Sequence, residues 1–88
     1  MDHIFKALAD PNRRRILEIL KERDMTVNEI NAKLPVTGAT LSHHLDILKR
    51  ANLVISEREG QFIRYSLNTS VFEEVIKLMI GVFKKGKQ

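Results

Sequence analysis

Apolar and polar residues alternate along this chain in a pattern that predicts four helices, a β-hairpin and a last helix. The first helix is short, and Ile4, Phe5 and Leu8 give it one apolar side. It should end before Pro11, because the residue that precedes a proline avoids the helical conformation. The chain therefore begins with a one-sided helix that must pack against something.

Capping residues mark the start of the next two helices. Asp10 is a typical N-cap, and a proline in the first turn of the following helix, residues 11 to about 21, fits that position. Thr26 and Glu29 have the spacing of a capping box, in which each side chain accepts from the backbone N–H of the other residue. A third helix therefore begins after Thr26, and Pro35 ends it.

A fourth helix follows after only a short turn. Thr37 can cap it, and its leucines continue at helical spacing from Gly38 to about Ala51. Two short helices joined by a turn of three or four residues predict a helix-turn-helix arrangement. A plain helical hairpin would give a similar pattern, so the segments that follow must distinguish the two.

The segment "LVISEREGQFIRYSL", residues 53–67, predicts a β-hairpin. Two runs of β-branched and aromatic residues flank Glu59 and Gly60, and the glycine supplies the positive φ that a hairpin turn needs. A hairpin placed directly after a helix-turn-helix is a wing. We therefore expect a mainly α fold with a β-hairpin wing, a winged helix-turn-helix in the order α-α-α-α-β-β-α, forming a single domain over residues 1–88.

The last helix, from about Ser70 to Phe83, is apolar nearly all round. Nine of the thirteen residues from Val71 to Phe83 are apolar, whereas a peripheral helix of a monomer normally has one polar side. An 88-residue chain has little core in which to sink such a helix. We expect it to pack against a second copy of the chain; the alternative is a helix buried entirely within the monomer.

Composition and charge narrow the class of protein. The chain has 43% hydrophobic and 30% charged residues, no cysteine, a net charge of +4 and a pI near 9.7. We expect a cytoplasmic protein without signal peptide or membrane insertion, because no apolar stretch is long enough and the N-terminal residues include an acid. The basic charge favours a polyanionic partner but does not establish one.

Two adjacent histidines, His43 and His44, lie in the fourth helix, and helical geometry separates them. At 100° per residue His44 lies at the edge of the leucine stripe, while His43 lies on the opposite side near Asp46 and Arg50. Neighbouring helical residues cannot chelate one metal, and His3 is the only other imidazole. We expect no metal site, no cofactor and no enzymatic activity, because the chain also lacks a supported catalytic set.

The outward start of the fourth helix is slim and polar, as entry into the major groove of double-stranded DNA requires. Serine and histidine can bond base edges or phosphates, and alanine can touch a thymine methyl group. An ordinary solvated face is the alternative interpretation. A further alternative is that the winged helix is a module for protein–protein interaction.

At this point the sequence resembles the ArsR family of small winged-helix repressors over essentially the whole chain. "FKALADPNRRRILEIL" resembles the family's opening, "TLSHHLDILKRANLV" its recognition helix and "EREGQFIRYSL" its wing. The resemblance implies that Ser42 and His43 contact bases and that His44 is the family's recurrent histidine. Gly38 and Ala39 match two further groove-facing positions, but they offer no long polar side chain.

The family's metal-sensing residues are absent. Thr26 and Asn28 stand where the resemblance would place sensor cysteines, and the last helix has Glu73 and Glu74 but no histidine. The chain is most similar to the cysteine-free autorepressor subgroup of toxin-immunity, or sporulation-delay, operons. A metal-sensing repressor with an unrecognised histidine and carboxylate site stays open as an alternative.

Together these observations predict a homodimeric repressor of an operon, its own among the candidates, which binds an imperfect palindrome in double-stranded DNA. Its release signal is something other than a thiolate-bound metal, and a protein that sequesters it is one candidate. The expected DNA contacts are Thr37, Gly38, Ala39, Thr40, Ser42, His43, Arg50, Arg58 and Arg64, with Lys49 as a further phosphate contact. The expected dimer interface consists of Ile4, Phe5, Leu8, Phe72, Val75, Ile76, Met79, Ile80 and Phe83. Arg13, Arg14 and Arg15 are expected on the helix surface in salt bridges.

Overall fold

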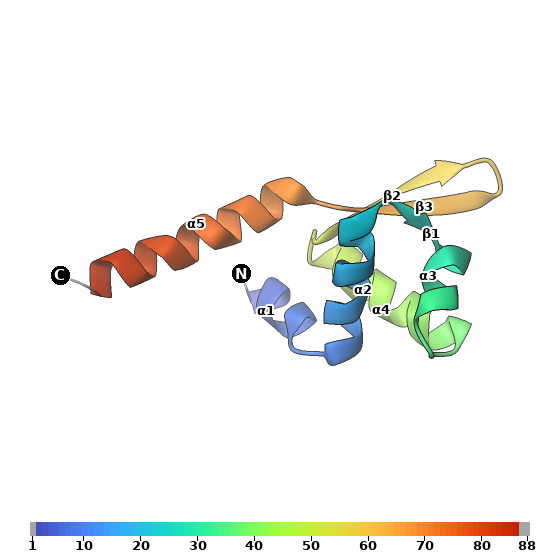
Figure 1. Ribbon diagram of the computed structural model, residues 1–88, viewed down its shortest axis with the longest axis horizontal. Helices are drawn as coiled ribbons and strands as arrows, with labels where there is room; N and C mark the ends of the chain where they lie inside the picture. The colour runs from blue at the N-terminus through green and yellow to red at the C-terminus, as the bar shows by residue number, and fades with distance from the viewer. Residues whose placement is uncertain (1, 87–88) are drawn as a thin grey trace.

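A computed structural model describes residues 2–86 as a winged helix-turn-helix with one long projecting helix (Figure 1). The mainly helical fold with a β-hairpin wing is therefore confirmed. The elements, in chain order, are α1 (Asp2–Leu8), α2 (Pro11–Glu22), β1 (Met25–Thr26), α3 (Val27–Lys33), α4 (Gly38–Arg50), β2 (Val54–Glu59), β3 (Phe62–Leu67) and α5 (Thr69–Gly86).

The predicted helix starts are confirmed by their hydrogen bonds. Asp10 Oδ1 accepts from the backbone N–H groups of Asn12, at 2.8 Å, and Arg13, at 3.1 Å. At the start of α3, Thr26 Oγ1 accepts from the N–H of Glu29, and a Glu29 carboxylate oxygen accepts from the N–H of Thr26. These bonds satisfy N–H groups that the first turn of a helix leaves without partners, so the sequence determines where α2 and α3 begin.

The predicted element order was incomplete, because a short strand, β1, precedes α3. β1 pairs antiparallel with β3, with Met25 opposite Tyr65 and Thr26 opposite Arg64, and the sheet order is β1-β3-β2. The N-cap Thr26 is extended, with φ −76° and ψ 166°, and this geometry allows it to pair with β3. Two residues are too short a run to show an alternating pattern, so periodicity could not reveal this strand.

The wing consists of β2 and β3, joined by the predicted turn. Gly60 has φ 63°, in the left-handed region that glycine adopts without steric cost. Val54 pairs with Leu67 at the base of the hairpin, and Glu59 pairs with Phe62 near its tip. The base packs on the core while the tip extends beyond it (Figure 1).

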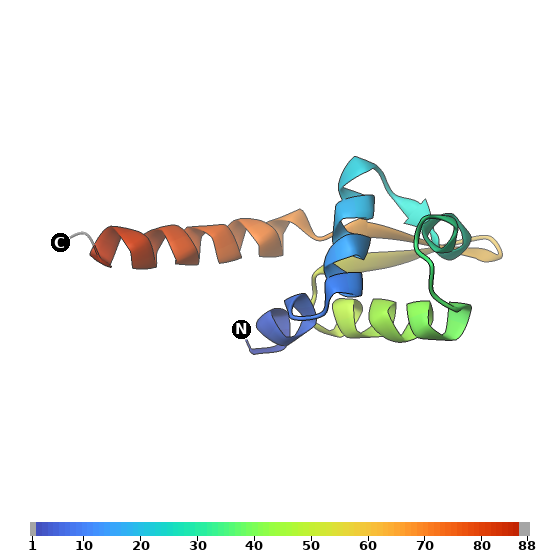
Figure 2. The same cartoon turned by 60° about the horizontal axis from the view of Figure 1, so that its bottom comes forward.

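The core lies among α1–α4 and the base of the wing. Its fully buried large side chains are Ile16, Met25, Ile30, Leu41, Leu45, Leu48 and Leu53. α5 contributes little to it: of its described side chains, only Val75 is buried. The alternative of a last helix sunk within the monomer is therefore wrong, and Figures 1 and 2 show α5 leading away from the rest of the molecule.

Among residues 2–86, no helix is both long and apolar enough to cross a membrane. α5 is the longest helix, with 18 residues, and its charged side chains interrupt the apolar run.

Candidate nucleic-acid interface

The turn between α3 and α4 is closed by a side chain of α3. Asn31 Nδ2 donates to the carbonyl oxygen of Val36 at 2.9 Å, and the N–H of Val36 donates to the carbonyl oxygen of Leu34 at 2.8 Å. These bonds fix the angle at which the chain enters α4. Asn31 was not among the predicted site residues, because its bond reaches five residues along the chain, beyond the two-residue spacing of a local asparagine turn.

The N-terminal half of α4 divides into an anchored side and a solvent-facing side. Leu41, Leu45 and Leu48 are fully buried and hold the helix on the core. The exposed positions coincide with most of the predicted DNA contacts: Thr37, Gly38, Ala39, Thr40, Ser42 and His43. The structure therefore brings these six residues together at one end of α4, which lies along the edge of the molecule in Figure 2.

Thr37 and Thr40 are already bonded to each other in this structure. Thr37 Oγ1 accepts from the N–H of Thr40 at 3.2 Å and donates to Thr40 Oγ1 at 3.0 Å. Both hydroxyls thus serve the helix cap, while the side chains of Ser42 and His43 stand free of the cap on the next turn.

The two histidines have the different environments that helical geometry predicted. His43 is exposed, whereas His44 is buried, with 6% of its surface accessible. Arg13 Nη1 lies 3.3 Å from Nδ1 of His44. A guanidinium can only donate, so Nδ1 is the acceptor when this contact is a hydrogen bond. His44 is therefore a structural residue of the α2–α4 contact.

The expected salt bridges of Arg13 and Arg14 are wrong, since neither forms one within residues 2–86, and Arg13 instead bonds to the end of α1. Its Nε donates to the carbonyl oxygen of Ala7 at 2.8 Å, and its Nη2 donates to that of Lys6 at 3.1 Å. Arg14 donates to the carbonyl oxygen of Leu8 at 2.8 Å. The two guanidinium groups thus cap the C-terminal end of α1, where cations are favourable. For Arg15 the expectation is confirmed: its Nη1 lies 3.2 Å from a carboxylate oxygen of Glu18.

Arg50, at the end of α4, pairs with Asp46 one turn earlier, at 3.1 Å. The carboxylate of Asp46, which the sequence placed near His43, is therefore paired with Arg50. The Arg50 side chain is 79% exposed, so the pair is a weak surface contact that leaves other donors of the guanidinium available.

The two arginines predicted at the wing occupy opposite faces of the hairpin. Arg58 pairs across the strands with Ile63, and its Nε donates to the carbonyl oxygen of Gly60 at 3.4 Å. Arg64 Nε lies 2.8 Å from a carboxylate oxygen of Glu59, and its Nη1 lies 3.8 Å from one of Glu29. Arg58 therefore extends at the exposed tip, while Arg64 ties the wing to α3.

Carboxylates of this network have lowered pKa values. Hydrogen bonds from the Thr26 backbone and then from Arg23, at 3.0 Å, lower the pKa of Glu29 from 4.5 to about 2. The hydrogen bond from Arg64 lowers the pKa of Glu59 below its usual value. Both groups are ionised at neutral pH, so they neutralise Arg64 locally and keep the α3 side of the wing from becoming a strongly positive surface.

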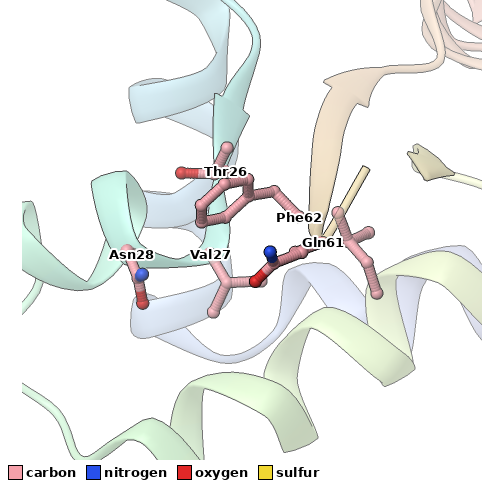
Figure 3. A pocket seen from close by; sticks show the side chains of 6 residues that line it. Thr26, Val27, Asn28, Gln61 and Phe62 are labelled. Atoms are coloured by element: carbon pink, nitrogen blue, oxygen red, sulfur yellow. The ribbon is translucent and has the colours of Figure 1, made fainter. Parts of the chain in front are cut away.

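A hollow of about 290 Å³ separates the start of α3 from the tip of the wing (Figure 3). Its lining consists of Thr26, Val27, Asn28, Gln61, Phe62 and Ile63, and the Phe62 ring lies beside Thr26 and Val27. These side chains are apolar or neutral, so the hollow offers no charge that would hold a phosphate or a metal.

The positions where a thiolate sensor was considered have other roles. Thr26 belongs to the capping box, and Asn28 is exposed on the first turn of α3. Within residues 2–86, no three histidine or carboxylate side chains lie close enough together to hold a metal ion.

The apolar residues predicted at a dimer interface differ in exposure. Ile4, Leu8 and Phe72 are partly buried and pack on the core, and Val75 is buried. The more exposed members are Phe5, Ile76, Met79, Ile80 and Phe83, which are 48–67% exposed. Leu78 and Val82 are exposed too, so all of these residues except Phe5, which lies on α1, expose apolar side chains on α5.

Comparison with known proteins gives consistent matches. The family described as bacterial regulatory protein, arsR family, matches residues 10–56. The transcriptional repressor SdpR of Bacillus subtilis is 45% identical over 98% of this chain and 96% of its own length. The solved structure of an ArsR-like transcriptional regulator from Rhodococcus sp. RHA1 matches 98% of this chain and 79% of that chain, with a TM-score of 0.91 and 26% identity. The structure of HlyU from Vibrio cholerae matches 92% and 88% of the two chains, with a TM-score of 0.76 and 30% identity.

Proposed function

We propose that this protein acts as a dimeric repressor. The chain belongs to the ArsR family of bacterial regulatory proteins and is therefore a DNA-binding transcriptional regulator. The observation that carries this proposal is the start of α4, where leucines anchor one side and small polar residues face solvent on the other. This shape fits the major groove, which is about 12 Å wide. Its site of action is the cytoplasm, where its DNA lies, and we assign it no catalytic activity.

Within this proposal, the exposed residues of α4 divide by chemistry. Ser42 and His43 bond base edges and provide direct sequence readout. Gly38 and Ala39 let the backbone approach the DNA, so specificity there comes from a thymine methyl contact and DNA shape. Thr37 and Thr40 lie at the cap, where the helix N-terminus attracts phosphate.

The basic residues nearby serve the DNA backbone. Arg58 reaches the minor groove or a phosphate from the wing tip, and Lys49 and Arg50 contact phosphates beside α4. Arg64 lies in ion pairs with Glu59 and Glu29, so we propose that its contribution to DNA binding comes through the position of the wing.

The dimer we propose uses α1 and α5. A two-fold axis makes the same apolar patch complementary to itself, which removes the exposed surface of α5 from water. The two α4 helices then enter successive major grooves, about 34–36 Å apart, and the operator is an imperfect palindrome. The same symmetry explains why α5 extends from the monomer instead of folding back on it (Figure 1).

We further propose that release from DNA does not depend on a thiolate-bound metal, because the chain contains no cysteine. The similarity to the transcriptional repressor SdpR supports repression, and we extend this to repression of an operon, its own, with release by a sequestering protein. Micromolar zinc, cadmium or arsenite should leave the DNA complex intact. A metal-dependent loss of binding that a chelator reverses would contradict this part of the proposal.

The experiment that tests the function is a DNA-binding titration at several salt concentrations. We expect tight binding to a fragment upstream of the protein's own gene and weaker binding to a scrambled duplex of equal length. The affinity for both should fall steeply with salt, because phosphate contacts release counterions. If instead the affinities were equal and nearly independent of salt, the winged helix would be a protein-interaction module.

A further inference from the structure

A second basic feature lies outside the predicted contacts, between α1 and the C-terminal end of α4. A pocket of about 380 Å³ is lined by His3 and Lys6 of α1, by Arg13 of α2, and by Ile47, Arg50 and Ala51 at the end of α4. In the part of the chain that the structure describes, its lining contains no aspartate or glutamate. Two arginines, one lysine and one histidine from three helices thus line one hollow.

The charge of this pocket is only partly neutralised. Arg13 is held in place by two carbonyl oxygens and by His44, and within residues 2–86 no carboxylate lies within 4 Å of its guanidinium. Over the same residues, Lys6 forms no ion pair either, whereas Arg50 is paired with Asp46. The Asp10 carboxylate lies beyond 4 Å of Arg13 and offsets its charge only in part, so the pocket keeps a positive character that favours an anion.

Capping of α4 does not account for Lys6 and His3. The last carbonyl oxygens of α4 accept from the backbone: Ala51 N–H donates to Ile47, Asn52 N–H to Lys49, and Leu53 N–H to Leu48, at 3.0–3.1 Å. Since these carbonyls already have partners, Lys6 and His3 are not required there. A ligand is therefore a better explanation of their convergence than the helix end.

The position of the pocket along α4 indicates what that ligand is. Arg50 follows His43 by seven residues, which is two helical turns, so both lie on the same side of α4 about 10 Å apart along its axis. This distance is comparable with the width of the major groove, about 12 Å. If His43 lies at base edges, Arg50 and the pocket beside it therefore lie near the phosphates that border the groove.

We infer that this pocket, with Lys6 and His3 as its free donors and Arg13 as its fixed floor, binds a phosphate group of the DNA backbone. The inference rests on the proposed function and extends the DNA surface from α4 and the wing to α1. Since α1 also belongs to the proposed dimer interface, this contact would couple the dimer arrangement to the docking of α4. Ile47 and Ala51 form an apolar wall beside it that suits the deoxyribose.

The test compares three single-residue variants. Lys6→Gln removes one pocket charge from an exposed side chain, Lys6→Arg retains it, and Lys21→Gln removes an equal charge from α2 outside the pocket. We measure the slope of log affinity against log salt for operator DNA and for a scrambled duplex. Sedimentation and thermal unfolding verify that each variant keeps the dimer and the fold.

For Lys6→Gln, losing one phosphate contact should flatten the salt slope by about 0.9 for each protomer. Lys6→Arg and Lys21→Gln should keep the wild-type slope. Equal slopes for Lys6→Gln and Lys21→Gln would overturn the inference. If the wild-type protein showed no preference for its operator, the proposed sequence-specific function would be wrong. The salt slope measured on scrambled DNA would still test the pocket.

A second arm distinguishes DNA from a free phosphate compound. Inorganic phosphate is titrated into the DNA-free protein while the backbone amide resonances of α1 and α4 are followed by NMR. Saturable binding that Lys6→Gln abolishes, together with an unchanged salt slope, would overturn the DNA assignment and point to a soluble phosphate ligand. Weak, non-saturating shifts together with the flattened slope support the DNA backbone.

Discussion

Nη1 of Arg13 lies 3.3 Å from Nδ1 of His44, and this contact links the start of α2 to the middle of α4. Because the same guanidinium also binds two carbonyl oxygens at the end of α1, it joins three helices. Two of them, α1 and α4, are the proposed dimer and recognition helices. Arg13 and His44 therefore add a polar contact to the apolar packing where these helices meet.

Replacing His44 by alanine should destabilise the fold. The change removes a buried ring and leaves a guanidinium donor without its acceptor, which costs about 2–3 kcal/mol of unfolding free energy. Urea denaturation checks this value, and His43→Ala is the matched control because that ring is exposed. Equal stability of the two variants would contradict the structural role of His44.

His43→Ala should instead act on DNA recognition. An exposed side chain that reads a base edge contributes about 1–3 kcal/mol of discrimination, and its loss should leave binding to scrambled DNA nearly unchanged. Fluorescence anisotropy with both duplexes measures the two affinities. If His43→Ala weakened both to the same extent, the side chain would be a general contact without sequence readout.

Glu29 gives the fold a specific dependence on pH. Its pKa falls from 4.5 in the unfolded chain to about 2 in the folded protein, so its contribution is complete above pH 4.5 and is lost as pH falls toward 2. Glu29→Gln keeps an acceptor for the capping box but removes this titration. The variant should therefore lose stability less steeply over that pH range than the wild type, as thermal unfolding at each pH will show.

Ile76 tests the proposed dimer surface, because 55% of its side chain is exposed on α5. Ile76→Glu would bury an unpaired carboxylate at the interface and should weaken association by several kcal/mol, while Ile76→Leu keeps the dimer. Operator affinity should then fall with the dimer although no DNA-facing residue has changed. If the Ile76→Glu variant remained dimeric in sedimentation equilibrium, Ile76 would not lie in the interface.

Local signals in the sequence predicted much of the fold and of the candidate site. Asp10, Thr26 and Glu29 mark the helix starts through bonds to nearby backbone groups, and Gly60 marks the turn of the wing. The separation of the two histidines followed from helical geometry alone. Each of these predictions depends only on residues within a few positions of one another.

Contacts between distant segments could not be predicted in this way. Arg13 and His44 are 31 positions apart, and the pairing of Arg64 with Glu29 depends on how the wing packs against α3. The pattern likewise favoured a last helix outside the monomer core, but it could not give the direction in which α5 leads away from that core. Both arginines were read as surface or DNA residues, because a sequence gives their charge without their partners.

The central claim is that two α4 helices, held by a dimer through α1 and α5, read one DNA site. A hydroxyl-radical footprint on the operator measures this most directly. We predict two protected half-sites of related sequence, with centres about 34–36 Å apart, or about 10–10.5 base pairs, on one face of the duplex. Protection of a single half-site by the wild-type protein, or protection that does not depend on sequence, would contradict the account.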